Sequence, residues 1–322
     1  MRDATDIRSV GVVGAGAIGS SWAALALVRG LHVVAHDPAP GAEARLRTTV
    51  GSRLDELAAT GADRDQRSAD LTWGDRLTFT ADLPALAAVC DVALECGPER
   101  LDVKRSVFAE LDAHCGPDVL LTSSSSGITP SSFQDACHLH PERVLVAHPF
   151  NPPHLMPLVE VVGGGRTSPE AVAAAMAFFA HLGKRPVHIR RELPGHLANR
   201  LQAALWREAY HLVAEGVASV EDIDVVISSG PGLRWALLGP IATQHLSGGD
   251  GGLAHILDHL GPPMVEWWAD LGSPELTPEL RARLVAGVED ELADRSGDDL
   301  TAQRDAALLD VLATKARHGL AG

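Results

Sequence analysis

The sequence predicts an α/β fold in which a doubly wound sheet domain is followed by an all-α domain. Up to about residue 190, short β-branched runs alternate with helical stretches, which is the pattern of a parallel sheet covered on both faces. Beyond the stretch 190–195 the strand signals stop, and helical segments separated by Gly and Pro follow. The length of 322 residues also suits two domains of roughly 150 residues each. We therefore expect a sheet domain over 1–190 and a helical domain over 191–322.

The elements of the sheet domain are expected where apolar runs are bounded by Gly, Pro or polar residues. Buried strands are expected at 9–13, 31–35, 91–95, 119–122, 144–147, 158–162 and 187–189. Helices are expected between them at 17–29, 43–59, 101–113 and 169–181.

The helical domain is expected to begin with a long helix opened by Pro194 and Gly195 and ending near Gly216. Leucines repeat along one face of this helix at a spacing of four residues. They are Leu197, Leu201 and Leu205. Further helices are expected at 220–228, 253–260, 278–292 and 302–317.

Composition and charge exclude several classes of protein. The chain carries 27 basic and 42 acidic residues, a formal net charge of -15, which argues against nucleic acid and anionic membranes as partners. The four cysteines form no CxxC pair and no zinc-finger spacing, so we expect no metal site and a reducing, cytoplasmic setting. The first residues are polar rather than signal-like, and no apolar run approaches the roughly 20 residues of a membrane span.

A glycine-rich turn lies between the first expected strand and helix. Gly14, Gly16 and Gly19, with Ala17 and Ile18 between them, follow the pattern in which a backbone turn and a helix N-terminus bind a pyrophosphate. This context makes the first domain Rossmann-type.

The second expected strand is followed by an acidic residue. Asp37 is placed to accept hydrogen bonds from the adenosine ribose. No arginine follows Asp37 to neutralise a 2′-phosphate, so NAD is expected as cofactor rather than NADP.

Two side chains suited to proton transfer lie at or near strand ends. His148 closes an apolar strand, and Glu160 interrupts the next apolar run. A carboxylate inside a buried strand needs a cation or donor, and a histidine that accepts a proton is a suitable partner. The serine run 123–126 supplies hydroxyls at the same sheet edge, and Asn199 can point into a cleft from the first turn of the long helix.

These segments together resemble the 3-hydroxyacyl-CoA dehydrogenase family, most nearly its gulonate and carnitine dehydrogenase branch. The resemblance covers nearly the whole chain. Its motifs are the glycine turn, 99–104, the serine run, 148–151, 157–161 and 195–201.

The resemblance implies roles for individual residues. It makes His148 the general base of an alcohol oxidation and Glu160 its orienting carboxylate. It places Ser125, Asn151 and Asn199 against the reacting hydroxyl, the cofactor or both, with Ser124 as the alternative to Ser125.

Two further residues, Glu99 and Lys104, match positions near the nicotinamide ribose. From sequence alone they could equally be a solvent-exposed pair near a helix start.

The substrate is expected to be a small 3-hydroxy acid, oxidised to the 3-keto acid. The chain has only three lysines, which offers few cations to bind the phosphates of a coenzyme A thioester. In addition, Met156-Pro157 occupies the place where acyl-CoA enzymes typically have Met-Lys. The segment 230–236 resembles the gulonate and carnitine dehydrogenase branch, and its Arg234 could bind a substrate carboxylate or simply cap a helix.

The identity of that acid stays open at this point. Four tryptophans of the helical domain could cage a quaternary ammonium, although tryptophans in a small domain are more often core. They are Trp206, Trp235, Trp267 and Trp268. Gulonate-like, carnitine-like and other acids therefore remain, with a 3-hydroxyacyl-CoA dehydrogenase of fatty-acid oxidation as the alternative.

Two other classes are disfavoured. A 3-hydroxyisobutyrate-type enzyme would use a helical catalytic lysine, whereas Lys184 follows Gly183 and precedes Pro186. A non-catalytic binding protein would need no working base.

The helical domain has apolar faces to bury, and a symmetric homodimer is the expected solution, which assigns residues 191–322 to substrate binding and dimerisation.

Overall fold

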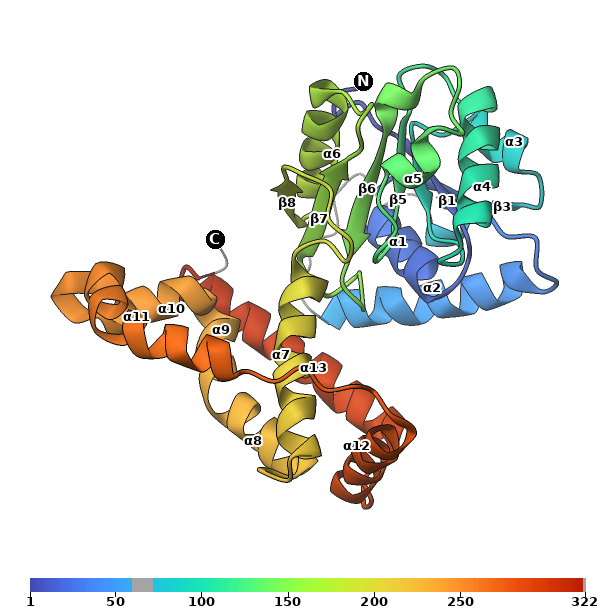
Figure 1. Ribbon diagram of the computed structural model, residues 1–322. Coiled ribbons are helices and arrows are strands. Elements are labelled where there is room, and N and C mark those ends of the chain that lie inside the picture. The colour runs from blue at the N-terminus through green and yellow to red at the C-terminus, as the bar shows by residue number, and fades with distance from the viewer. Residues whose placement is uncertain (60–71, 321–322) are drawn as a thin grey trace. The chain divides into compact units, whose positions relative to one another are not determined.

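The computed structural model describes residues 1–59 and 72–320 (Figure 1). The chain divides into two compact units, Met1–Asn199 and Arg200–Gly322.

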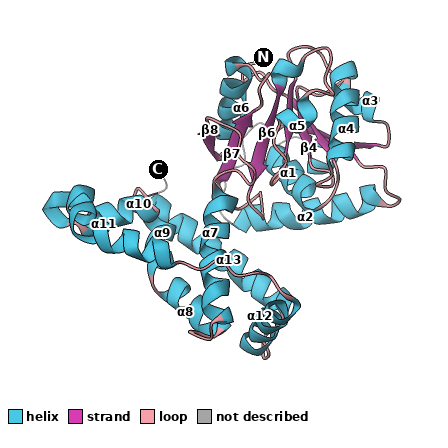
Figure 2. Cartoon of the chain, in the orientation of Figure 1, coloured by secondary structure: helices cyan, strands magenta, loops and turns pink. Residues whose placement is uncertain are grey.

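The first unit is built on one sheet, as Figure 2 shows in magenta. In the described part of the chain its strand order is β3-β2-β1-β4-β5-β6-β7-β8. The bounds are β1 (Ser9–Val13), β2 (His32–His36), β3 (Leu77–Thr80), β4 (Val92–Glu95), β5 (Leu120–Ser123), β6 (Val144–Pro149), β7 (Leu158–Gly163) and β8 (Arg185–Ile189). The order reverses direction beside β1, which is the switch point where ligands bind in such sheets.

One strand pair departs from the predicted parallel sheet. β6 and β7 are antiparallel, whereas the other neighbouring strands of the described sheet are parallel. The reason is the short connection 150–157, because a parallel crossover needs about a dozen residues or more. The antiparallel register sets His148 directly opposite Glu160.

Helices cover both faces of this sheet. One apolar cluster joins α1 (Ala17–Val28), α2 (Ala42–Ala59) and α6 (Pro169–His181) to one face, with Trp22 and Phe179 at a ring distance of 5.4 Å. The other cluster joins α3 (Leu83–Ala87), α4 (Leu101–His114) and α5 (Ser131–Gln134) to the opposite face, through Phe108 and Phe133 among others. The doubly wound prediction is confirmed.

Most strands were predicted to within a residue or two, but β3 was not predicted. It is a short edge strand beside β2, preceded by a 3-10 turn at Trp73–Arg76. Two of its four residues are threonines, so it lacks the apolar run of the central strands.

The second unit is helical. Its elements are α7 (Ala198–Ala214, which begins at the end of the first unit), α8 (Val220–Ser229), α9 (Pro231–Leu238), α10 (Pro240–Ser247), α11 (Gly252–Asp270), α12 (Pro278–Glu291) and α13 (Gly297–Arg317). Helices α9 and α10 were not predicted, and α11 runs on through Pro262 and Pro263, where a helix ending at residue 260 was expected. Much of α11 is exposed, so water can satisfy the carbonyl groups that lose a backbone donor to these prolines.

The start of α7 also corrects a prediction. Pro194 and Gly195 precede the helix, and Gly195 (φ +76°) and His196 (φ +53°) both lie in the left-handed region. The predicted leucine stripe is not a core seam within this chain, because Leu197, Leu201 and Leu205 are 41%, 69% and 39% exposed.

No helix of the described residues is long and apolar enough to cross a bilayer.

Candidate active site

The glycine turn joins β1 to α1 as the sequence predicts. A Cβ on Gly14 would lie 2.8 Å from the Cys96 carbonyl, and its φ of +101° favours glycine. A Cβ on Gly19 would overlap the Gly14 carbonyl oxygen, so the helix can approach the turn only without a side chain there. These two positions fix the path of the loop around Gly16.

The surroundings of Gly16, Ala17 and Asp37 fit a dinucleotide. A Cβ on Gly16 would meet open space, and Gly16 and Ala17 are exposed. Gly16 is the N-cap of α1 and provides no side-chain cap, which leaves the N-terminal N–H groups, Ile18 among them, suited to an anion. Asp37 follows β2 and accepts hydrogen bonds from the backbone N–H of Ala15 (2.9 Å) and Ala39 (2.8 Å).

The His148–Glu160 pair forms as predicted. His148 Nδ1 lies 2.8 Å from Glu160 Oε2, and both side chains are buried. Glu160 Oε1 accepts hydrogen bonds at 2.9 Å from the backbone N–H groups of Leu197 and Ala198, at the start of α7.

These contacts fix the charge of the carboxylate. Burial alone would raise the pKa of Glu160, but the hydrogen bonds from His148 and from the two backbone N–H groups outweigh it and lower the pKa. An ionised carboxylate can only accept a hydrogen bond, so Nδ1 of His148 is the protonated nitrogen of the pair, and in the neutral imidazole the lone pair is on Nε2.

The first three serine hydroxyls of the run 123–126 each bond to a different side chain. Ser123 donates to Glu95 (2.6 Å), Ser124 accepts from the Trp22 indole (3.2 Å), and Ser125 donates to Glu99 (2.6 Å). Ser125 Oγ also accepts a hydrogen bond from the backbone N–H of Ile128 (2.9 Å). Of the two serines considered from sequence, Ser125 is the one bonded to Glu99.

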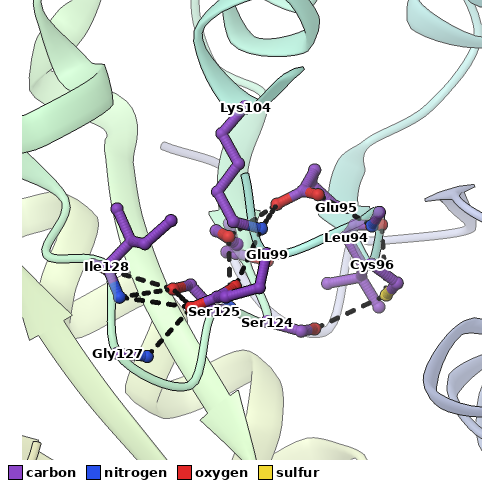
Figure 3. Close-up of polar contacts among 12 residues, drawn as sticks. Leu94, Glu95, Cys96, Glu99, Lys104, Ser124, Ser125, Gly127 and Ile128 are labelled. Atoms are coloured by element: carbon purple, nitrogen blue, oxygen red, sulfur yellow. Dashed lines mark hydrogen bonds and ion pairs between the residues drawn. The ribbon is translucent and has the colours of Figure 1, made fainter. Parts of the chain in front are cut away.

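Glu99 and Lys104 belong to a larger charged network (Figure 3). Lys104 Nζ lies 2.8 Å from Glu95 and 3.4 Å from Glu99, and its side chain is 1% exposed. Burial opposes ionisation of Glu99, but Ser125, Lys104 and the Ile128 and Gly127 N–H groups together lower its pKa. The reading of Glu99 and Lys104 as a solvent-exposed pair is therefore wrong for Lys104.

Two site residues escaped the sequence analysis. Glu95, at the end of β4, is fully buried and accepts from Lys104, Ser123 and the backbone N–H of Gly97. A carboxylate closing an apolar strand was the available signal. His196 is fully buried with its ring 5.3 Å from that of His148, and a second histidine in the 195–201 motif was its signal.

The remaining predicted residues are placed as follows. Asn199 Nδ2 donates to the Ser126 carbonyl (2.9 Å), which joins the start of α7 to the serine turn. Asn151 is exposed and lies two residues after the end of β6. Arg234 is exposed on α9 of the second unit. Within the described residues, no group of three or more His, Cys, Asp or Glu side chains could hold a metal ion.

Family models match both parts of the chain. The 3-hydroxyacyl-CoA dehydrogenase NAD binding domain matches residues 9–193, and the C-terminal domain of the same family matches residues 195–273. The fold and the glycine turn define an NAD-dependent dehydrogenase. The chain belongs to the 3-hydroxyacyl-CoA dehydrogenase family, as the sequence motifs predicted.

Curated relatives span nearly the whole chain. L-carnitine dehydrogenase of Streptomyces coelicolor is 46% identical over 99% of this chain and 98% of that protein. L-carnitine dehydrogenase of Pseudomonas aeruginosa is 47% identical over 98% of each.

Solved structures share the fold. The 5-formyl-3-hydroxy-2-methylpyridine 4-carboxylic acid 5-dehydrogenase, an NAD+ dependent dismutase, matches with a TM-score of 0.81 and 29% identity over 98% of this chain and 99% of that one. (S)-3-hydroxybutyryl-CoA dehydrogenase of Ralstonia eutropha matches with a TM-score of 0.66 and 29% identity, over 88% and 95% of the two chains.

Proposed function

We propose that the protein oxidises the 3-hydroxyl of L-carnitine to the 3-keto acid with NAD as acceptor. The observation that carries this proposal is the sequence identity of 46% and 47% to two L-carnitine dehydrogenases over almost the full length. The net charge of -15 and the scarcity of lysine agree with a small substrate that carries a trimethylammonium group better than with a phosphate-rich coenzyme A thioester.

Proton transfer is assigned to His148. With Nδ1 bonded to Glu160, Nε2 is the atom that accepts the hydroxyl proton, and the buried carboxylate stabilises the imidazolium that results. The bound nicotinamide would take the hydride from the carbinol carbon.

Other residues of the first unit are assigned to orientation. Ser125, Asn151 and Asn199 hold the substrate hydroxyl and the cofactor in position. Ser125 is itself fixed by Glu99, and Asn199 by the serine turn. Lys104 keeps Glu99 in place from the buried side.

The cofactor is assigned to the turn and the strand ends around it. The turn 14–19 would bind the pyrophosphate, and Asp37 the adenosine ribose. Glu99 and Lys104 lie at the carboxyl ends of the strands, where the nicotinamide ribose would bind.

The second unit is assigned to substrate binding and dimerisation. Arg234 offers a guanidinium for the carboxylate. Aromatic side chains suit a trimethylammonium group, and the tryptophans of this unit are 38–63% exposed, so the alternative that they form a core does not hold within this chain. They are Trp206, Trp235, Trp267 and Trp268.

The exposed apolar side chains of this unit also support a homodimer. They lie on nearly every helix, and a second copy would bury them. The four cysteines are free, which agrees with a cytoplasmic location.

A substrate panel tests the proposal. NADH absorbance is followed with L-carnitine, L-gulonate, 3-hydroxybutyrate and 3-hydroxybutyryl-CoA, each with NAD and with NADP. We expect the highest kcat/KM for L-carnitine with NAD. A higher kcat/KM for 3-hydroxybutyryl-CoA would overturn the proposal in favour of the acyl-CoA alternative.

A further inference from the structure

His196 is an uncommon residue in three respects. Its side chain is fully buried, its φ of +53° is in the left-handed region, and among the described residues its Nδ1 atom has no hydrogen-bond partner. A left-handed conformation outside glycine and an unpaired buried polar atom each destabilise the folded state. Such strain is retained mainly at functional sites.

The contacts of His196 define its protonation. Nε2 lies 3.1 Å from the Ser125 carbonyl oxygen, which can only accept, so Nε2 carries the proton. Burial lowers the pKa of His196, and the hydrogen bond to Ser125 opposes this only in part. The charged and titratable groups around the ring are His148, Glu160 and Glu99. His196 is therefore a neutral donor beside the proton-accepting histidine.

The backbone around His196 joins two parts of the site. The left-handed pair at 195–196 precedes the two N–H groups that bind Glu160, those of Leu197 and Ala198. The side chains of the same segment reach the serine turn, His196 at the Ser125 carbonyl and Asn199 at the Ser126 carbonyl. One short segment thus bonds both to the carboxylate of the proton-accepting pair and to the turn that carries the Ser125 hydroxyl.

We propose that His196 is a positioning residue, whose Nε2–H donor holds the Ser125 main chain in register with the His148–Glu160 pair. The inference rests on the proposed function, in which His148 accepts the proton and Ser125 orients the hydroxyl. His196 acts on the reaction through Ser125, without itself touching the substrate. Its neutrality matters because a second cation near His148 would oppose proton uptake.

Two substitutions separate the hydrogen bond from the shape of the ring. His196→Phe keeps a planar ring but removes the donor, and we expect kcat to fall roughly 10- to 100-fold, the effect of a small misplacement. His196→Gln restores a donor near the position of Nε2, and we expect it to recover most of that loss. NAD affinity measured by fluorescence titration should change less than about threefold in both variants, because His196 bonds to neither the turn 14–19 nor Asp37, which are proposed to bind the pyrophosphate and the adenosine ribose.

A matched control removes the same kind of bond elsewhere. Gln134 is buried and donates to the Pro141 carbonyl (2.7 Å), outside the proposed site. Gln134→Leu should lower the Tm without changing kcat. If Gln134→Leu lowers kcat as much as His196→Phe does, the effect is one of general destabilisation and the proposal is overturned.

A double-mutant cycle with Ser125→Ala completes the test. If His196 acts through Ser125, His196→Phe should lower kcat less than about threefold in the Ser125→Ala background. Full additivity, or wild-type kcat for His196→Phe alone, overturns the inference while the proposed function stands. Wild-type kcat for Ser125→Ala overturns the assignment of Ser125, and the inference with it; failure to oxidise L-carnitine overturns the proposed substrate alone.

Discussion

The two units of the chain differ in how they use buried side chains. The first unit has two apolar clusters on either side of its sheet, and the buried charged side chains of the described residues all lie in it. In the second unit, the buried large apolar side chains of the described part are Val213, Ile256 and Leu280, while large apolar residues on most of its helices are exposed. The first unit can therefore support an internal polar site, whereas the second lacks a core of its own.

This difference agrees with different roles for the two units. A buried ion pair or hydrogen-bonded acid needs a rigid, well-packed surrounding to repay its desolvation. The sheet unit supplies that surrounding for Glu95, Glu160 and their partners. The helical unit instead presents apolar surface that another molecule can cover, in keeping with the proposed roles in dimerisation and substrate binding.

The largest effect is expected at the base of the first unit. Replacing His148 by Gln should lower kcat by roughly 10³-fold or more, because no other imidazole is bonded to Glu160 among the described residues and general bases contribute about 10²–10⁴-fold. NAD should bind as in the wild type, measured by fluorescence titration. Turnover within tenfold of the wild type would show that the polar site is not the seat of proton transfer.

The buried charges of the first unit provide the second test. Asp112 is 2% exposed and accepts from Arg143 (3.0 Å), from Leu139 N–H (2.7 Å) and from His140 N–H (3.0 Å). Asp112→Asn leaves the fully buried Arg143 without its counter-charge, and we expect the free energy of unfolding to fall by about 3–5 kcal/mol in urea titrations. Asp305→Asn breaks a pair of the second unit whose arginine, Arg304, is 53% exposed, and it should cost less than about 1 kcal/mol.

The same carboxylate predicts a pH dependence. Burial would raise the pKa of Asp112, but Leu139 N–H, Arg143 and His140 N–H outweigh burial and lower the pKa below its ordinary value. The stability contributed by a carboxylate with a lowered pKa is present above the ordinary value and is lost as pH falls from there through the folded-state pKa. Asp112→Asn should therefore flatten the acid side of the stability profile below about pH 5. An unchanged slope would contradict this.

The second unit should respond most to the loss of apolar surface. Leu201 is 69% exposed within this chain, and Leu201→Glu should weaken a homodimer by roughly 10- to 100-fold, the equivalent of about 1.5–3 kcal/mol for burying a leucine. Leu139 of the first unit is 62% exposed and serves as the matched control. Sedimentation at micromolar concentration should show dissociation for Leu201→Glu alone. Equal behaviour of the two variants would mean that the exposed surface of α7 is not an interface.

The sequence was most informative where a residue type was unusual for its own segment. Three features stand out within their own segments and were identified from the sequence. They are Asp37 after a strand, Glu160 inside an apolar strand and the glycines of the turn. The class of enzyme was confirmed by the family models. The roles of the individual residues stay predictions.

The features that were missed depend on neighbours far apart in the chain. The partners of Glu95 are Lys104 and Ser123, and they meet only when α4 and β5 pack beside β4. The place of His196 in the site depends on the left-handed backbone at 195–196, which brings its ring to the Ser125 carbonyl. The leucine stripe of α7 has the period of a core helix, but period alone does not say whether the covering surface belongs to the same chain.

The smallest effects come from helix caps, and they distinguish how cooperative the two units are. Ser168 caps α6 by accepting from Ala171 N–H (3.1 Å), and Ser219 caps α8 by accepting from Asp222 N–H (3.0 Å). Each change to Ala should cost about 0.5–2 kcal/mol locally.

Helix α6 buries Phe178 and Phe179 in the sheet unit, so Ser168→Ala should lower the global free energy of unfolding. No described residue of α8 is buried, so Ser219→Ala should instead raise amide hydrogen exchange within α8 while the global value stays nearly unchanged. Equal global losses for the two variants would show that α8 unfolds together with the rest of the protein, and that the second unit is more firmly held than its exposed side chains imply.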